Sequence, residues 1–351
     1  MNAMRALIKT PSALPKSVMS ELSLTSRRSR VLILGGDQLA KELGQTLIYK
    51  SKFRYELVGF LEADSARVGE RMVNPGIIGT FDQLHEIVDR YGIGTIAVCL
   101  NDRRGGRLPL QMLLDVKAMG VDVVDGHDLY EQESGRLSID LLKPSTLIFS
   151  TGFRRRAVTM GVKRLLDATV SAIGLIVLAP LFAFIAVLIK LESAGPVFYH
   201  QTRVGLRGAP YSIWKFRSMQ ADAEVDGARW AVKGDTRITR VGKWLRKLRL
   251  DELPQLINVW RGEMSLVGPR PERPIFVQEL RNNIPYYDLR YTVRPGITGW
   301  AQIRYRYAAT EEESHVKLQY DLYYVKNLAL SLDCRILIET ARVVLLHEGA
   351  H

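Results

Sequence analysis

ATVSAIGLIVLAPLFAFIAVLI, residues 168–189, is the stretch that decides how this chain is organised, because it runs for 22 positions without a charged side chain. As a helix it would be about 33 Å long, close to the thickness of the bilayer hydrocarbon core. Helices of globular domains are rarely apolar on every face over such a length. The stretch therefore predicts a membrane helix, with a buried helix of a globular core as the alternative.

Pro180, preceded by Ala179, lies at the middle of this run. A proline inside a helix removes a hydrogen bond and bends the axis. A single span places its positive flank on the cytoplasmic side, but here both flanks are basic. We therefore expect a re-entrant hairpin over 161–194, with Ala179 and Pro180 at its apex, in preference to a full span. The basic flanking residues are Arg154, Arg155, Arg156, Lys163, Arg164, Lys190, Arg203 and Arg207.

Residues 29–134, upstream of the apolar run, alternate short apolar strands with helical stretches. Such alternation predicts an α/β fold, here a doubly wound, Rossmann-like domain over 29–134. Residues 1–28 are rich in Ser, Pro and Lys and are expected to form a flexible leader, and residues 135–160 a linker. The expected strands are 31–34, 55–60, 95–100 and 121–124, and the expected helices follow Gly36 and cover 81–91 and 109–119.

The turn after the first strand bears on whether this domain binds a dinucleotide. The fingerprint G-x-G-x-x-G/A would fall on residues 35–40, GGDQLA. Its second glycine lets the backbone approach the pyrophosphate, and here that position is Asp37, whose carboxylate would repel phosphates. A module for packing, regulation or homodimerisation is therefore favoured over nicotinamide binding.

Positive charge is concentrated in the second part of the chain. Residues 1–150 hold 19 Lys and Arg against 18 Asp and Glu, whereas residues 151–351 hold 30 against 19. This asymmetry indicates an anionic partner, which by charge alone is nucleic acid, phospholipid head groups or a diphosphate substrate. Cys99 and Cys334 lie far apart in sequence, which suits a reducing compartment and predicts that each is a small buried apolar residue.

Residues 240–249 predict a basic amphipathic helix, because Val241, Trp244, Leu245 and Leu248 recur at helical spacing among Lys and Arg. Such a helix carrying a tryptophan can lie in the membrane interface. The alternative is a solvated helix on a globular core.

Asp251-Glu252 follows this helix and precedes Pro254, and proline is tolerated in a first helical turn. We therefore expect a new helix to begin near Asp251, with Asp251 as its N-cap or just inside it. The positive helix end would favour the ionised carboxylate and attract a phosphate to the same place. The alternative is that Asp251 only caps the helix.

Two rigid turns downstream suit a phosphate-containing ligand. Pro269 and Pro271 fix the backbone on both sides of Arg270, which reduces the entropy lost when its guanidinium holds a phosphate. Residues 294–302, RPGITGWAQ, offer backbone N–H groups, a hydroxyl and an aromatic plane for a nucleotide base and ribose. Together with the acidic pair, these turns predict a polyanion site.

These motifs closely resemble those of the bacterial sugar transferases called monotopic phosphoglycosyl transferases, and they follow the family's order. The N-terminal module and residues 144–154 further resemble the branch associated with exopolysaccharide synthesis and exosortase systems. The resemblance implies a mainly helical α+β catalytic domain over 195–351. The matching stretches are 163–191, 195–204, 215–219, 245–260, 264–272, 294–302 and 320–324.

The resemblance also implies a two-step reaction. In the family an aspartate attacks the β-phosphorus of a UDP-sugar, UMP leaves, and polyprenyl (undecaprenyl) phosphate takes the hexose-1-phosphate from the covalent intermediate. This reaction would initiate exopolysaccharide or other surface glycan synthesis at the cytoplasmic face of the bacterial inner membrane, whose lipid is a further partner. Glucose and galactose are the favoured sugars, with N-acetylated hexosamines as alternatives.

The family's site residues map onto this sequence one by one. Asp251 matches the nucleophile, and Glu252 matches the residue that helps to hold Mg²⁺. Asp321 matches a further site acid, and Ala179-Pro180 stands where many relatives have Ser-Pro. The expected phosphate-binding residues are Lys215, Arg246 and Arg270, and the residues expected around the nucleotide are Arg294, Thr298 and Gln302.

Two other classes of protein compete with this interpretation. A membrane-tethered nucleotide-sugar dehydrogenase or epimerase needs an intact glycine fingerprint, which Asp37 interrupts, and a Tyr-x-x-x-Lys motif. Tyr323 is followed by Lys326 at three positions rather than four. A membrane scaffold or nucleic-acid-binding protein would have no use for an acidic dyad beside a proline-fixed arginine, so no nucleic acid partner is expected.

Overall fold

The computed structural model describes residues 28–100, 108–141, 150, 152–154, 156–220, 236–305 and 310–345. The chain forms two compact units that divide after Ser134. Apart from Arg28, the predicted leader lies outside the described residues, as does much of the predicted linker.

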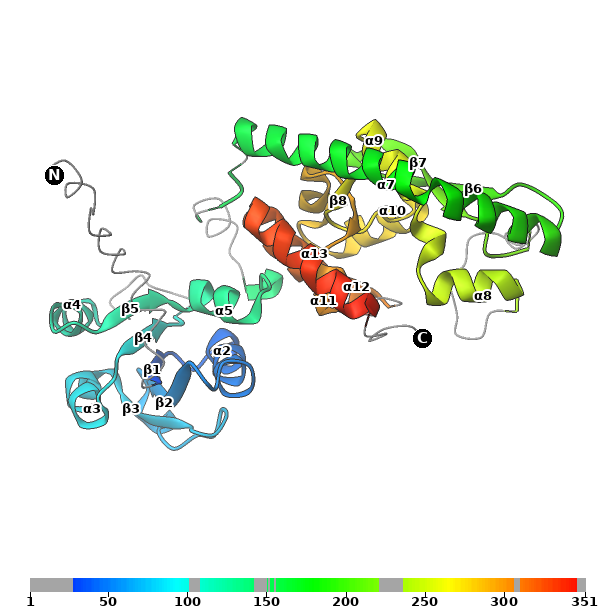
Figure 1. Cartoon of the computed structure of the whole chain (residues 1–351). Coiled ribbons are helices and arrows are strands. Elements are labelled where there is room, and N and C mark those ends of the chain that lie inside the picture. Colours follow the sequence, from blue (N-terminus) through cyan, green and yellow to red (C-terminus); the bar gives the residue numbers. More distant parts are fainter. Residues whose placement is uncertain are drawn as a thin grey trace, which may run out of the picture. The chain divides into compact units, whose positions relative to one another are not determined.

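A five-stranded parallel sheet forms the centre of the first unit, in the order β3-β2-β1-β4-β5 (Figure 1). Parallel neighbours need crossover connections, and most of these are helices. Helix α2 packs against α5, and α3 against α4. The elements are β1 (Ser29–Leu34), α2 (Gln38–Tyr49), β2 (Tyr55–Glu62), β3 (Ile77–Thr80), α3 (Leu84–Tyr91), β4 (Thr95–Val98), α4 (Leu110–Ala118), β5 (Asp122–Asp125) and α5 (Gly126–Ser134).

The apolar run that begins the first unit is its most buried strand. Val31, Leu32, Ile33 and Leu34 have no exposed surface, as expected of a central parallel strand covered on both faces. Leu32 and Leu34 belong to a core that includes residues of α3 and α4. The four strands expected from the sequence are present. Strand β3 was missed because it is too short to show a period, and α5 was also missed.

Helix α7 (Ala157–Glu192) carries the apolar run of the second unit. By length and composition it is able to cross a membrane, and 11% of its most apolar 18-residue window is buried. Its buried side chains are Lys163, Asp167 and Ser171 in the first half and Ile185 and Ile189 near the end. Because the apolar surface between these two groups is mostly uncovered, α7 does not resemble the core helix of a soluble domain.

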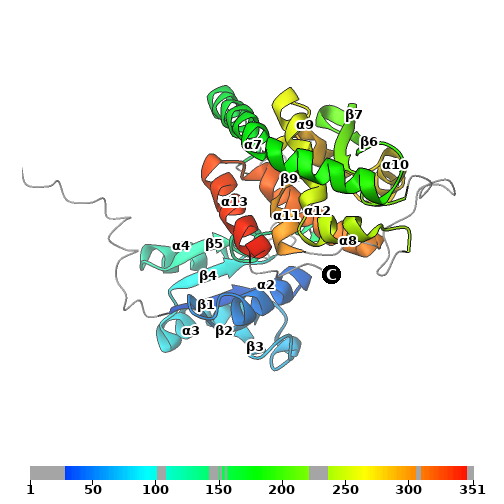
Figure 2. The same ribbon diagram turned by 45° about the vertical axis from the view of Figure 1, so that its right-hand side comes forward.

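The helix continues through Ala179 and Pro180, and Figure 2 shows it changing direction along its length. The sequence predicted a break between two helical arms at this point, and α7 shows none. The physical reason is that one missing backbone hydrogen bond bends a long helix without ending it. Both apex residues are exposed.

The described residues of the rest of the second unit are mainly helical, with two small sheets. Strands β6 and β7 form an antiparallel hairpin, and β8 pairs with β9 in parallel. The elements are β6 (Phe198–Val204), β7 (Pro210–Phe216), α8 (Arg240–Lys247), η5 (Leu250–Glu252), α9 (Gln255–Arg261), β8 (Ser265–Val267), α10 (Pro274–Asn283), η6 (Tyr287–Thr292), β9 (Gly296–Thr298), α11 (Trp300–Arg304), α12 (Glu311–Lys326) and α13 (Leu330–Leu345).

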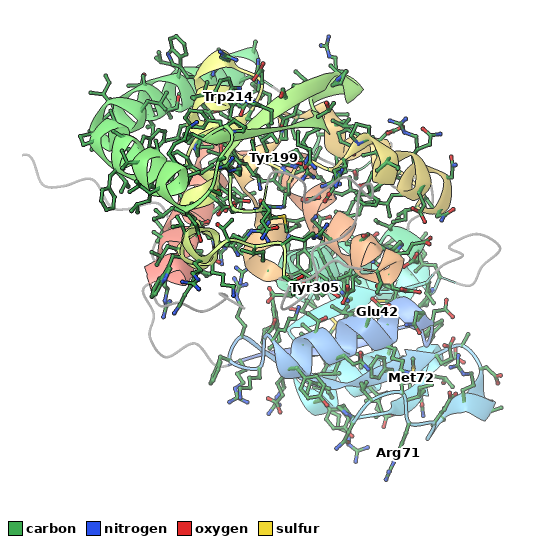
Figure 3. The ribbon with its side chains drawn as sticks, turned by 90° about the vertical axis from the view of Figure 1, so that its right-hand side faces the viewer. Glu42, Arg71, Met72, Tyr199, Trp214 and Tyr305 are labelled. Carbon is green, nitrogen blue, oxygen red and sulfur yellow. The ribbon has the colours of Figure 1, made fainter. Side chains whose placement is uncertain are left out.

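The β6–β7 hairpin has two chemically different faces because successive side chains in a strand alternate. Phe216 of the apolar face packs in a cluster with Ile185 and Ile189 of α7. Tyr199 of β6 is paired directly with Lys215 of β7 on the other face. Tyr199 is labelled in Figure 3. The hairpin thus has an apolar face against α7 and a face that carries Lys215.

Part of the predicted linker belongs to the second unit. Leu137 and Ile139 are buried in a cluster with Leu318 and Leu322 of α12. The prediction for the cysteines was right for Cys99, which is buried, and wrong for Cys334, which is exposed on α13. Residues on opposite faces of an amphipathic helix differ in burial, and one sequence does not show which face is covered.

Candidate functional site

The acidic pair lies in η5, a 3-10 turn between α8 and α9. The chain enters this turn through Arg249, whose φ of 54° lies in the left-handed region. Asp251 therefore lies just inside a short 3-10 helix, as a helix start near Asp251 predicted, although it is neither the N-cap of α9 nor in its first turn, because α9 begins at Gln255. Pro254 precedes α9 instead, and its missing N–H is a group that a helix start leaves unbonded anyway. Asp251 and Glu252 are both largely buried, at 8% and 9% exposure.

Two cations that the sequence singled out meet at Glu252. Lys215 Nζ donates to Glu252 Oε1 at 2.9 Å, and Arg270 Nη2 donates to the same oxygen at 2.7 Å. Among the residues that the structure describes, none donates a hydrogen bond to the carboxylate of Asp251. Glu252 is therefore fixed by its partners, and Asp251 has its oxygens available for a ligand.

The surroundings push the pKa values of the two carboxyl groups in opposite directions. Burial raises the pKa of Asp251, and the charge of Glu252 adds to that rise against the opposing cations Lys215, Arg246 and Arg270. Burial also acts to raise the pKa of Glu252, but Arg270 and Lys215 together outweigh it and hold that pKa well below its usual range. Glu252 is thus the permanently charged member of the pair.

A buried asparagine aligns the dyad with the strand that carries Lys215. Asn258 of α9 is completely buried, its Oδ1 accepts from Trp214 N at 3.0 Å, and its Nδ2 donates to Ser212 O at 2.7 Å. Nδ2 also donates to Glu263 at 2.6 Å. The bonds to Trp214 and Ser212 tie the helix that follows Asp251 to β7. Asn258 was not predicted as a site residue because these two partners are distant in sequence.

Arg246 approaches the dyad from α8. Its Nε donates to Ser218 Oγ at 2.9 Å. The helix comes this close because position 242 is glycine, where a Cβ would lie 2.0 Å from the carbonyl oxygen of Ser218. On the same helix Trp244 is 64% exposed whereas Leu245 is buried, so the predicted apolar face is only partly covered.

The loop that presents Arg270 follows β8 and lies against β9. Gly268 N donates to Thr298 O at 2.9 Å, and Gly296 N donates to Pro269 O at 2.9 Å. A Cβ on Gly296 would lie 2.1 Å from Gly268 N, so these backbones meet at a distance that only glycine allows. The second rigid turn therefore supports the first.

The residues expected around the nucleotide have their bonds within the fold. Arg294 Nε donates to Gly262 O at 2.8 Å, just beyond the end of α9. Thr298 Oγ1 bonds Thr340 Oγ1 at 2.7 Å, and Gln302 Nε2 donates to Ile297 O at 3.1 Å. Among described atoms Gln302 Oε1 is buried without a partner. The structure brings none of these three into contact with the dyad.

Asp321, the further acid, also lies behind the dyad rather than in it. Its Oδ2 lies 2.8 Å from Arg290 Nη2, and the same nitrogen donates to Arg270 O at 2.9 Å. Burial raises the pKa of Asp321 and outweighs the opposing charges of Arg290 and Lys317. Arg290 was not predicted from sequence, because Arg270 and Asp321 lie far from it in the chain.

Helix α7 is joined to the site through α9. Arg164 Nη1 donates to Val259 O at 2.6 Å, and Nη2 donates to Trp260 O at 2.7 Å. Lys163 Nζ donates to Val267 O at 3.1 Å, at the end of β8. The apolar helix is therefore tied to α9, which follows the dyad, and to β8, which precedes the loop that carries Arg270.

The residues of the dyad suit Mg²⁺ that is bound mainly by a substrate. No group of three or more His, Cys, Asp and Glu side chains suited to a metal occurs in the described part of the chain. Mg²⁺ is usually held by one or two carboxylates together with substrate phosphates. Two adjacent carboxyl groups beside the cations Lys215, Arg246 and Arg270 fit that pattern.

The glycine turn of the first unit is filled by an ion pair. Arg67 Nη2 donates to Gly36 O at 3.2 Å, and Arg67 Nη1 lies 3.1 Å from Glu62 Oε2. A Cβ on Gly36 would lie 2.5 Å from that carboxylate oxygen. A dinucleotide needs an open approach to this turn and an acid at the end of β2 for its ribose. Here the acid is bound to Arg67, which argues against the dehydrogenase alternative.

Known proteins match the second unit above all. The family model for bacterial sugar transferases matches residues 158–347. A UDP-N-acetylgalactosamine-undecaprenyl-phosphate N-acetylgalactosaminephosphotransferase of Aeromonas hydrophila is 45% identical over 220 residues, 63% of this chain and 51% of that protein. An undecaprenyl-phosphate glucose phosphotransferase of Komagataeibacter xylinus is 32% identical over 330 residues, 91% of this chain and 60% of that protein.

A shorter relative matches over nearly its whole length. An exopolysaccharide production protein of Rhizobium leguminosarum bv. phaseoli is 43% identical over 188 residues, which are 51% of this chain and 92% of that protein. The chain spans 51% and 60% of the two longer relatives, so parts of those proteins have no counterpart in this comparison.

Proposed function

Since this chain belongs to the bacterial sugar transferase family, we propose that it transfers a hexose-1-phosphate from a UDP-sugar to undecaprenyl phosphate and releases UMP. The observation that carries the proposal is the buried dyad, in which Lys215 and Arg270 hold Glu252 while the carboxylate of Asp251 stays available. A carboxylate is a workable nucleophile at phosphorus when nearby cations offset the charge of the diphosphate.

The proposed reaction has two displacements at one phosphorus atom. In the first, a carboxylate oxygen of Asp251 bonds to the β-phosphorus, the bond from that phosphorus to the bridging oxygen breaks, and the electron pair leaves with UMP. In the second, an oxygen of undecaprenyl phosphate bonds to the same phosphorus, and the bond to Asp251 breaks and restores the carboxylate. Lys215, Arg246 and Arg270 hold the phosphates in place.

Mg²⁺ is part of the proposal, with Glu252 as its protein ligand and the substrate phosphates as the others. When bound, the ion supplies charge neutralisation and orients the diphosphate. Arg294, Thr298 and Gln302 make their hydrogen bonds within the fold. Their proposed role near the nucleotide is therefore indirect: they shape the turn over residues 294–302.

We also propose that α7 enters and leaves the membrane on one face. Pro180 inside α7, the change of direction along that helix (Figure 2), the basic residues at both ends and the exposed Trp244 on α8 support a re-entrant arrangement at the cytoplasmic face of the bacterial inner membrane. In that arrangement the head group of a lipid phosphate reaches the dyad from the interface. The strand order and the filled glycine turn of the first unit support a Rossmann-like module without a dinucleotide. This unit is proposed to mediate homodimerisation.

The test is UMP release by the full chain with a panel of UDP-sugars (glucose, galactose and their N-acetylated forms), undecaprenyl phosphate and Mg²⁺. We expect turnover with at least one sugar and a loss of at least roughly 10³-fold in Asp251→Asn, because an amide does not attack phosphorus. A matched control is Asp288→Asn, which alters an exposed ion pair with Arg281 and should leave turnover unchanged. Substantial UMP release by Asp251→Asn would sink the covalent mechanism.

A further inference from the structure

A second layer of buried charge lies behind Arg270. The carbonyl oxygen of Arg270 accepts a hydrogen bond from Arg290 Nη2 at 2.9 Å, and that nitrogen lies 2.8 Å from Asp321 Oδ2. Arg290 Nη1 also donates to Tyr287 OH at 2.6 Å. Arg290 and Asp321 are 3% and 1% exposed, so both charges have left water and depend on these contacts.

The two residues after Arg270 are held in the same way. The carbonyl of Pro271 accepts from Arg203 Nη1 at 3.1 Å. The carbonyl of Glu272 accepts from Val204 N at 3.0 Å, and its carboxylate accepts from Lys317 Nζ at 2.5 Å. The backbone over 270–272 is thus tied at consecutive residues to η6 and β6, and the side chain of Glu272 is tied to α12.

We propose that Arg290 and Asp321 are positioning residues for Arg270. Resting on the function proposed above, the role is to fix the backbone at Arg270 so that its guanidinium meets Glu252 and the diphosphate together. The planar fork of Arg290 reaches the Arg270 carbonyl, the Asp321 carboxylate and the Tyr287 hydroxyl at once, which a lysine ammonium at the end of a flexible stem does not reproduce. Asp321 compensates the buried charge of Arg290 and aims it at the carbonyl.

The size of the expected effect follows from geometry. A displacement of about 1 Å in a group that orients the reacting phosphate can cost about 10²-fold in rate. Arg290→Lys and Asp321→Asn are therefore expected to lower kcat/KM for the UDP-sugar by about 10²-fold while leaving folded, membrane-bound protein.

The experiment is a double-mutant cycle measured by UMP release from the full chain in detergent. The variants are Arg290→Lys, Asp321→Asn, Arg270→Ala and the two doubles with Arg270→Ala, each with its thermal unfolding midpoint recorded. If Arg290 and Asp321 act through Arg270, neither double loses more than Arg270→Ala alone. The matched control is Asp333→Asn, which alters a buried carboxylate paired with Lys163 at 2.7 Å. Its loss of activity should multiply with the loss caused by Arg270→Ala.

Each result has one meaning. The positioning role is supported if the activity losses of Arg290→Lys and Asp321→Asn do not add to that of Arg270→Ala, while the loss of the control Asp333→Asn does. Losses that multiply with Arg270→Ala, or a single-variant loss that follows the unfolding midpoint alone, overturn it. If the wild-type protein releases no UMP from any of the sugars, the proposed function itself is overturned. That outcome differs from failure of the positioning role, in which the wild-type protein is active.

Discussion

Asp251 and Glu252 are neighbours in one 3-10 turn, yet their surroundings assign them different tasks. Glu252 accepts from Lys215 and Arg270 and stays charged, whereas burial raises the pKa of Asp251 and its oxygens remain available. Pairs of acids whose environments push their pKa values apart are a common basis for a division of roles. The proposed nucleophile must be ionised to attack, so the raised pKa of Asp251 predicts that activity depends on pH.

The pH profile of kcat/KM for the UDP-sugar reports this effect. Since the ionised form attacks, activity should fall as pH decreases through the pKa of Asp251, with a midpoint above the ordinary aspartate range. Arg246 acts to lower that pKa, so Arg246→Gln should move the acid limb to higher pH. Lys243→Gln, on the exposed face of the same helix, is the matched control and should leave the midpoint in place. An unchanged or lower midpoint in Arg246→Gln would contradict the assignment of Asp251 as nucleophile.

Helix α7 shows how a single element joins the membrane to the chemistry. Its apolar surface is mostly uncovered around Pro180, while Arg164 near its start caps the carbonyls that end α9. Helix α9 in turn begins three residues after Glu252 and is bonded to β7 through Asn258. A displacement of α7 would therefore be transmitted to the dyad through α9.

Topology is testable with single cysteines at exposed positions on either side of α7, in a chain with Cys99 and Cys334 replaced by serine. Arg154→Cys and Thr202→Cys should both react with a membrane-impermeant thiol reagent from the cytoplasmic side only. Ala179→Cys, at the proposed apex, should be protected from both sides because it lies in the bilayer. Periplasmic labelling of either flank would instead establish a full span.

At the scale of the whole molecule, the division after Ser134 separates the parallel sheet from every site residue. The first unit has its own core around Leu32 and Leu34. The second unit includes Leu137 and Ile139, which are buried with residues of α12. Catalysis and the proposed dimerisation are therefore assigned to different units.

Removal of residues 1–134 should leave UMP release within a few-fold of the full chain, because Asp251 and its partners all remain. The same protein should lose dimerisation, measured by sedimentation in detergent, if the first unit is the dimer module. A chain beginning at Gly152 is the comparison, since it also lacks Leu137 and Ile139. Its unfolding midpoint should be lower, because burying a large apolar side chain is worth on the order of 2–5 kcal/mol. Equal midpoints for the two truncations would show that these side chains contribute nothing to the second unit.

The family was predictable from sequence because the motifs that carry it are confined to short stretches. Lys215, Arg270 and the dyad lie in such stretches, and the match to bacterial sugar transferases confirms the family predicted from them. The apolar composition of 168–189 likewise needs no partner to be recognised. These features depend on local sequence, so the sequence by itself determined them.

The tertiary structure decided which groups meet. It placed the dyad in a 3-10 turn rather than at the N-terminus of α9, and it placed Asp321 behind Arg270 beside Arg290. It also carried α7 through Pro180 without a break. Asn258 lies far in sequence from Trp214 and Ser212, as Arg290 does from Arg270 and Asp321, and a buried polar group finds such a partner only when the fold closes. No local pattern in one sequence contains that information, because the contacts exist only after distant segments have packed.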